Sequence, residues 1–211
     1  LAGTDPGAPS GLPDWTRAHL LAHLAHNADA LINLLTWART GVPTPMYASP
    51  DARAEAIRAG AGASMPELLD ALHASAQRLA DAIDSLPEPT WAATVTSAQG
   101  REITAADVPW LRVREVWIHA VDLDVGTGWD SLPAELASAL LRELARTVGG
   151  KLPDGGAQLV ATDSDVVVPL GPGGVVTVSG RVADLLAWLS GRGPASALSA
   201  DGGVPTLPAW L

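Results

Sequence analysis

The hydrophobic pattern of this chain changes from helical to strand-like near the turn from Gly126 to Ser131, and this change constrains the fold most. Upstream, apolar residues recur at the three- and four-residue spacing of a helix face. Downstream lie short runs rich in valine, separated by glycine, proline and aspartate, which is typical of strands. The sequence therefore predicts an α+β protein, with a helical domain over residues 1–128 and a smaller α+β domain over residues 129–211.

Start and stop signals divide the upstream part into helices. The first helix is predicted from an N-cap at Asp14 to about Arg39, with an apolar stripe made of Leu20, Leu24, Leu31 and Leu35. Further helices are predicted over residues 51–59, 64–85 and 107–124, the second of them opened by a capping box from Ser64 to Glu67. Residues 90–103 are compatible with a loop or a short hairpin.

The downstream part mixes strands with helices. Strands are predicted over residues 157–162, 165–170 and 174–179, with helices over 133–148 and 181–190 and an extended tail. The glycine-rich segment 171–174 lies between two of these strands and precedes no helix, so it predicts a turn and not a phosphate-binding loop.

Composition excludes several functions. The net charge is −10 and no basic segment that could bind nucleic acid is visible. The same charge disfavours binding to anionic membranes. The absence of cysteine excludes disulfides, cysteine-ligated zinc and a protein thiol nucleophile. No apolar run approaches the length of a transmembrane helix, and no signal peptide is seen. We therefore expect a cytoplasmic protein, and we expect it to be a monomer.

Glu115 and His119 form the most informative pair in the sequence. Their spacing of four residues places both side chains on one helix face, which also carries Val108 and Ile118. A carboxylate and an imidazole on an apolar face need a partner, and a divalent metal is one that suits both. The alternatives are a simple Glu–His hydrogen bond, or an ion pair of Glu115 with Arg112 or Arg114. Asp122, three residues after His119, is placed to orient its ring.

Three histidines crowd the first helix: His19, His23 and His26. His23 lies at the edge of the leucine stripe, whereas the other two lie further round toward solvent. His23 is therefore the one expected to face the interior, although a half-buried histidine without a ligand role is the alternative. Near the other end of the chain, Arg192 lies between two glycines after the last predicted helix, where a solvated arginine is the ordinary interpretation.

Several strings together resemble one known family. WTRAHLLAHLAHNADALINLLTWARTG (15–41), VREVWIHAVDLDVG (113–126), RVADLLAWLSGRG (181–193) and the closing LPAWL resemble the mycothiol-dependent maleylpyruvate isomerases, within the DinB-like group of metal-binding bundles. The resemblance implies an up-down four-helix type of bundle followed by a small α+β domain. Family members usually begin with a helix ahead of the lead-in, so it also implies that a piece precedes this chain or that a fourth bundle helix is absent.

The resemblance also implies site residues and chemistry. The metal ligands of the family fall on His23, Glu115 and His119, and its important C-terminal arginine falls on Arg192. The implied reaction is cis–trans isomerisation of maleylpyruvate to fumarylpyruvate in gentisate breakdown, with mycothiol as the thiol and a divalent metal, for which we expect zinc. The partners would then be an anionic small molecule and a low-molecular-weight thiol. A protein without cysteine is compatible with a thiol supplied from outside.

Two other functions stay open from the sequence. One is a thiol S-transferase of the same fold, and the other is a non-enzymatic binder whose metal is purely structural. A closed four-ligand site, for instance with His19 added, would favour the binder. A site with an open coordination position would favour an enzyme.

Overall fold

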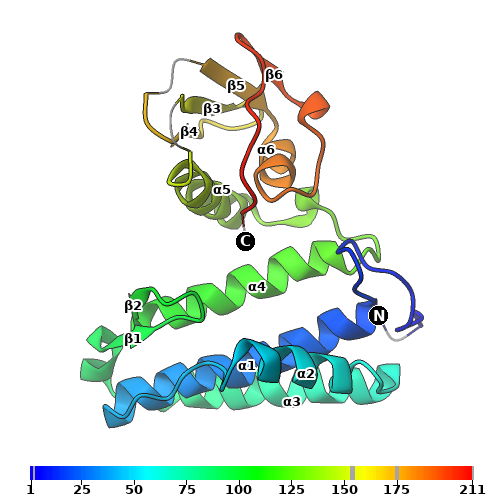
Figure 1. Cartoon of the computed structure of the whole chain (residues 1–211), viewed down its shortest axis with the longest axis vertical. Helices are drawn as coiled ribbons and strands as arrows, with labels where there is room; N and C mark the ends of the chain where they lie inside the picture. The colour runs from blue at the N-terminus through cyan, green and yellow to red at the C-terminus, as the bar shows by residue number, and fades with distance from the viewer. Residues whose placement is uncertain (2, 153–154, 174–175, 211) are drawn as a thin grey trace. The chain divides into compact units, whose positions relative to one another are not determined.

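The computed structural model describes residues 1, 3–152, 155–173 and 176–210. The chain divides into two compact units, Leu1–Gly126 and Thr127–Leu211, which are described separately below. The change in hydrophobic pattern along the sequence predicts a domain boundary between residues 128 and 129. Six helices and two small sheets are described, so the predicted α+β class is confirmed (Figure 1).

The first unit is a helical bundle. Its helices are α1 (Arg17–Thr40), α2 (Pro50–Gly60), α3 (Met65–Asp84) and α4 (Val108–Asp122). Between the last two lie the short helical turns η1 (Glu88–Ala92) and η2 (Ala105–Asp107), and an antiparallel hairpin of β1 (Thr94–Thr96) and β2 (Glu102–Thr104). The α1 helix contacts each of the other three helices, so it lies at the centre of the unit.

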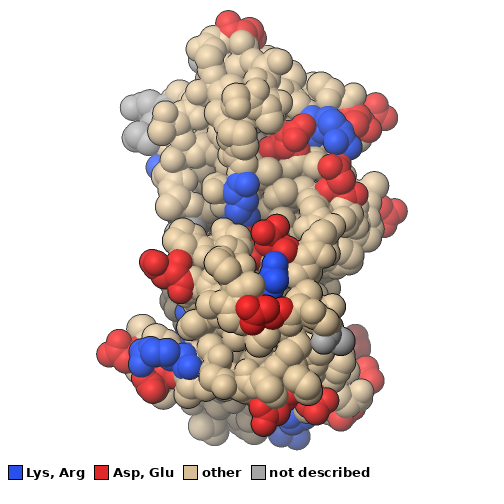
Figure 2. Space-filling view, turned by 90° about the vertical axis from the view of Figure 1, so that its right-hand side faces the viewer, with Lys and Arg blue, Asp and Glu red and all other residues tan. Residues whose placement is uncertain are grey.

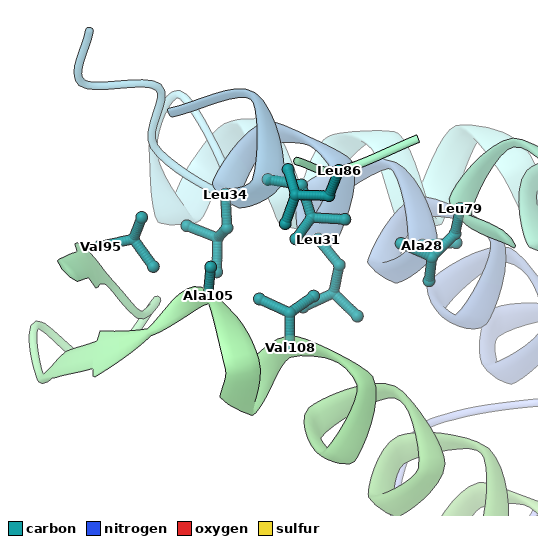
Figure 3. Packing of buried hydrophobic residues seen from close by; sticks show 9 residues of the cluster. Ala28, Leu31, Leu34, Leu79, Leu86, Val95, Ala105 and Val108 are labelled. Carbon is teal, nitrogen blue, oxygen red and sulfur yellow. The ribbon is translucent and has the colours of Figure 1, made fainter. Parts of the chain in front are cut away.

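The four helices alternate in direction, as the contacts along α1 show. The start of α1 packs with the start of α3 and the end of α4, through Leu21, Leu68 and Leu123. Further along, Ala28 lies beside Leu79 late in α3, and Leu31 lies on the side of α1 that faces Val108 early in α4 (Figure 3). The α2 helix runs back along α1, and the two helices pack closely at its last residue, Gly60, where an added Cβ would lie 3.0 Å from the Ala22 methyl. With α2, the described part of this unit contains four helices, one of the two alternatives that the resemblance left open being a bundle without its fourth helix.

The central position of α1 explains why it is buried nearly all round. The four leucines of the predicted stripe are buried, and so are residues on its other faces, such as Ala18, Ala25 and Leu34. Two apolar clusters result, one at each end of the bundle. Full burial of one leucine side chain contributes roughly 1.5–3 kcal/mol to the free energy of unfolding.

The N-terminus of α1 differs from the expectation. The N-cap is Thr16 and not Asp14, which takes a left-handed conformation with φ of 62°. Thr16 accepts a hydrogen bond from the backbone N–H of His19, and its own N–H donates to Nδ1 of His19. A capping box built on histidine is not among the usual cap patterns, which is why the sequence suggested the aspartate.

The second unit places helices on a small sheet. Its elements are η3 (Trp129–Ser131), α5 (Ala134–Gly149), β3 (Ala157–Ala161), β4 (Val167–Leu170), β5 (Val176–Gly180), α6 (Val182–Leu189), η4 (Ala195–Ala197) and β6 (Ser199–Ala200). The strand order is β4-β3-β5-β6, with β3 parallel to β5 and the other pairs antiparallel. α5 packs against β4 and α6, and α6 packs against β3 and β5.

The predicted strands of this unit are present with shifted ends. The turn at residues 171–173 joins β4 to β5, with Gly171 and Gly173 at positive φ, while residues 174–175, where the third strand was predicted to begin, lie outside the described residues. β6 was not predicted, because two residues are too short to show alternation.

Charged side chains are spread over the surface. On the face shown in Figure 2, the few arginine and lysine side chains stand singly or beside acidic ones, with no broad basic patch. In the described part of the chain, no helix is long and apolar enough to cross a membrane.

Candidate metal centre

His23, Glu115 and His119 come together in the first unit. His23 lies in the second turn of α1, and the other two lie one turn apart on α4. The antiparallel packing of these helices brings one possible ligand atom from each residue to within 4.8 Å of the others. It is the one group of three or more such side chains found among the described residues.

The Glu115 carboxylate divides its two oxygens between different partners. Oε2 lies 3.1 Å from His23 Nε2 and 3.4 Å from His119 Nε2, whereas Oε1 accepts a hydrogen bond of 3.3 Å from Arg114. The Glu–His and Glu–Arg contacts that the sequence offered as alternatives are therefore both present. They leave a single carboxylate oxygen facing both imidazoles.

Asp122 fixes the orientation of the His119 ring. Its Oδ2 lies 2.8 Å from His119 Nδ1, and the aspartate is buried. Since a carboxylate only accepts, Nδ1 carries the hydrogen and Nε2 is left to face Glu115 and His23. This is the carboxylate–histidine arrangement that positions metal-binding rings in proteins.

The pKa shifts follow from burial and from these contacts. Burial acts most strongly on Glu115 and would raise its pKa, but hydrogen bonds and the charges of the two histidines hold that pKa well below its usual range. Burial lowers the pKa of His23, with Glu115 opposing it. For His119, burial is again the largest influence, yet Asp122 and Glu115 together raise its pKa. Without a metal, these contacts favour the ionised form of Glu115 and the protonated form of His119.

The donor set fits a divalent metal. Two imidazole nitrogens and one carboxylate oxygen are ligands that zinc takes, and three protein ligands leave a position open. The oriented ring of His119 satisfies the outer-shell requirement of such a site. The residues present are therefore compatible with one bound metal ion.

The other two histidines of α1 do not join this cluster. Nδ1 of His19 lies 2.8 Å from the Thr16 hydroxyl at the helix start, so that ring belongs to the N-cap. His26 instead lines a pocket between α1, α2 and residues 46–48. A closed site with His19 as a fourth ligand is not what the described residues form.

Arg192 lies in the second unit, just after α6. Its Nη1 donates 2.8 Å to the Ser190 carbonyl, and its guanidinium stacks 5.8 Å from the centre of the Trp210 ring. Gly191, which precedes it, has a φ of 74° that favours glycine. The role of Arg192 toward a substrate stays a prediction.

Sequence reasoning missed several residues around His23. Trp15 meets its ring edge-on at 5.7 Å, and Arg53 Nη2 lies 3.3 Å from its Nδ1. Arg112 donates to Asn27 Oδ1 at 3.0 Å, one turn further along α1. No spacing rule signals these contacts, because each joins residues of separate elements or depends on how two helices pack.

Comparison with known proteins adds an independent observation. The sequence model of the family described as "Mycothiol maleylpyruvate isomerase N-terminal domain" matches residues 1–124. A crystal structure of the mycothiol-dependent maleylpyruvate isomerase is 38% identical with a TM-score of 0.88, covering 97% of this chain and 86% of that one. The structure of a histidine-to-alanine mutant of the mycothiol-dependent maleylpyruvate isomerase is 37% identical with a TM-score of 0.88, covering 98% and 88%.

None of the curated proteins matches the sequence. The family match nevertheless spans more than half of the chain, and the structural match extends over both units. The ligand-compatible cluster lies within the matched residues. This chain therefore belongs to the mycothiol maleylpyruvate isomerase family.

Proposed function

We propose that this protein isomerises maleylpyruvate to fumarylpyruvate, with mycothiol as the thiol and one metal ion held by His23, Glu115 and His119. The observation that carries the proposal is the convergence of these three side chains within 4.8 Å, in a chain of this family. We infer zinc as the metal, because nitrogen and carboxylate donors in a three-ligand set suit it. We further expect a cytoplasmic monomer.

The chain itself contains no cysteine, so the thiol has to be a second small molecule. When bound, the thiol supplies a nucleophile that adds to the conjugated double bond, which then becomes single and can rotate before elimination restores it. The reaction gains and loses no atoms overall. A metal ion held by His23, Glu115 and His119 would supply a positive charge, which lowers the pKa of a nearby thiol and stabilises negative charge that develops on the substrate.

The protein residues supply positioning and charge. Asp122 keeps Nε2 of His119 directed at the cluster, and Arg114 holds the second oxygen of Glu115. These contacts leave one donor atom per ligand residue for the metal. We propose that Arg192 neutralises one substrate carboxylate, because a planar guanidinium meets a carboxylate with two parallel hydrogen bonds.

The test is turnover of maleylpyruvate by the zinc-loaded protein, with and without mycothiol. We expect fumarylpyruvate to form only when the thiol is added, and we expect removal of the metal by a chelator to abolish the reaction. Isomerisation in thiol-free buffer would overturn the external-thiol mechanism. A stable thioether as the end product would instead identify an S-transferase.

A further inference from the structure

Arg53 reaches the candidate metal centre from α2, a helix that provides none of the three ligands. Its Nη2 lies 3.3 Å from His23 Nδ1, on the side of the ring opposite to Glu115. Its guanidinium also lies 5.5 Å from the centre of the Tyr47 ring. Burial raises the pKa of the Tyr47 hydroxyl, and Arg53 and Asn27 oppose that rise, so both of these side chains lie close to it.

The partners of Arg53 set it apart from its neighbours. Among the described residues, no carboxylate lies within ion-pairing distance of its guanidinium. By contrast, Arg58 pairs with Glu55 on the same helix, and Arg78 pairs with Asp29 at 2.7 Å. Arg17 donates to the Leu123 and Asp124 carbonyls at the end of α4. Arg53 is a half-buried cation whose strong donors face only an imidazole nitrogen and a phenol.

A pocket of about 180 Å³ opens beside Arg53. Residues from α1, α2 and the segment before α2 line it, among them His26, Asn33, Met46, Tyr47 and Arg53. Asp29 also lines it, but Arg78 already holds that carboxylate through two hydrogen bonds. Arg53 therefore faces both the ligand His23 and a space for a small molecule.

Hydrogen-bond chemistry indicates what this space would take. A guanidinium only donates, so His23 Nδ1 must accept in the contact seen here. Arg53 and Tyr47 both line the pocket, so an anion held there would meet the guanidinium donors that the His23 contact does not use.

We propose that Arg53, with Tyr47, binds a carboxylate of the substrate at the edge of the metal centre. The proposal rests on the proposed function, in which the substrate is a dicarboxylate, and it gives the second carboxylate a partner besides the one proposed for Arg192. The ligand class is a small acyclic dicarboxylate.

The test uses maleate, a cis dicarboxylate that lacks the ketone, and requires neither thiol nor turnover. Calorimetric titration of the zinc-loaded protein should give binding that weakens at least about tenfold in Arg53→Gln. Arg53→Lys should weaken it as well, since a point charge does not replace the planar fork. Arg58→Gln is the matched control on the same helix and should bind maleate as the wild type does.

Metal content separates carboxylate binding from a purely structural role. We expect Arg53→Gln to retain its zinc, and its KM for maleylpyruvate to rise more than kcat falls. Unchanged maleate binding in Arg53→Gln, no maleate binding by the wild type, or loss of zinc in Arg53→Gln would each overturn the proposal. If maleate binds through Arg53 but maleylpyruvate is not isomerised, the proposed function fails while the carboxylate site stands.

Discussion

Nδ1 of His119 lies 2.8 Å from Oδ2 of Asp122, one helical turn further along α4 and buried. The contact fixes which nitrogen of the ring faces Glu115. We predict that Asp122→Asn weakens zinc binding by roughly 10–100-fold, because an amide can donate to Nδ1 and so select the wrong tautomer. Zinc affinity measured by competition with a chromophoric chelator checks this.

Asp124→Asn is the matched control for that change. Asp124 is exposed, two residues further on, and its left-handed φ of 51° is one that asparagine also accepts. We expect it to bind zinc as the wild type does. Equal zinc affinities of Asp122→Asn and Asp124→Asn would show that Asp122 does not support metal binding.

The ligand set gives a second prediction. His23→Ala, Glu115→Ala and His119→Ala should each lose stoichiometric zinc, because each removes one of three converging donors. His26→Ala and His73→Ala are controls, since His26 lies outside the cluster and His73 is exposed. Zinc retained in all three ligand variants, as measured by elemental analysis of the purified proteins, would refute the assignment.

Helix periodicity predicted which of these side chains point into the bundle. His23 lies at the edge of a leucine stripe that is buried, and the four-residue spacing of Glu115 and His119 places both on the face of α4 that meets α1. Asp122 followed from the same periodicity, at a spacing of three. These are relations within one helix, which a sequence carries directly.

Contacts between different helices could not be predicted from the sequence. Arg53 and His23 are 30 positions apart, and they meet because α2 packs closely on α1 where Gly60 faces Ala22. Only the packing of the two helices reveals that Arg53 points at the site rather than at solvent. The Thr16 cap was missed for a similar reason, because its partner is a histidine, which is not a usual capping residue.

Arg192 carries the third prediction. If it binds a substrate carboxylate, Arg192→Ala should lose about tenfold to a few hundredfold in kcat/KM, since a charge-assisted hydrogen bond contributes roughly 1.5–3 kcal/mol. Arg192→Lys should be impaired too, because the bidentate fork is lost. Zinc content should stay unchanged in both variants.

The stacking of Arg192 on Trp210 suggests a competing structural role. Trp210→Leu tests it, because this variant removes the stacked ring and keeps the guanidinium. We expect Trp210→Leu to lower the melting temperature while retaining most of the turnover. Near-normal turnover and KM in Arg192→Ala would mean that Arg192 serves the fold and not the reaction.

The fourth prediction concerns pH. In the metal-free protein burial opposes the charged form of His119, but Asp122 and Glu115 raise its pKa above the ordinary value of 6.5. Its contribution to stability is therefore fully present below about pH 6.5, the value in the unfolded chain, and is lost as pH rises through the raised pKa. The pKa of His23 is lowered from 6.5, and the pKa of Glu115 is well below its ordinary value of 4.5. Both groups therefore titrate at lower pH than His119 does.

With zinc bound, the contribution of His119 to stability should depend on pH in the opposite direction. A metal ion has to displace the His119 proton, so zinc affinity should increase with pH across the interval in which the metal-free protein loses stability. In chelator, the difference in unfolding free energy between the wild type and His119→Gln should shrink as pH rises above about 6.5 and through the raised pKa of His119. With zinc bound, the same difference should grow over that interval. Denaturant unfolding with chelator and with zinc measures this difference. Parallel pH profiles of stability for the wild type and His119→Gln would contradict the prediction, because protonation of His119 would then not affect stability.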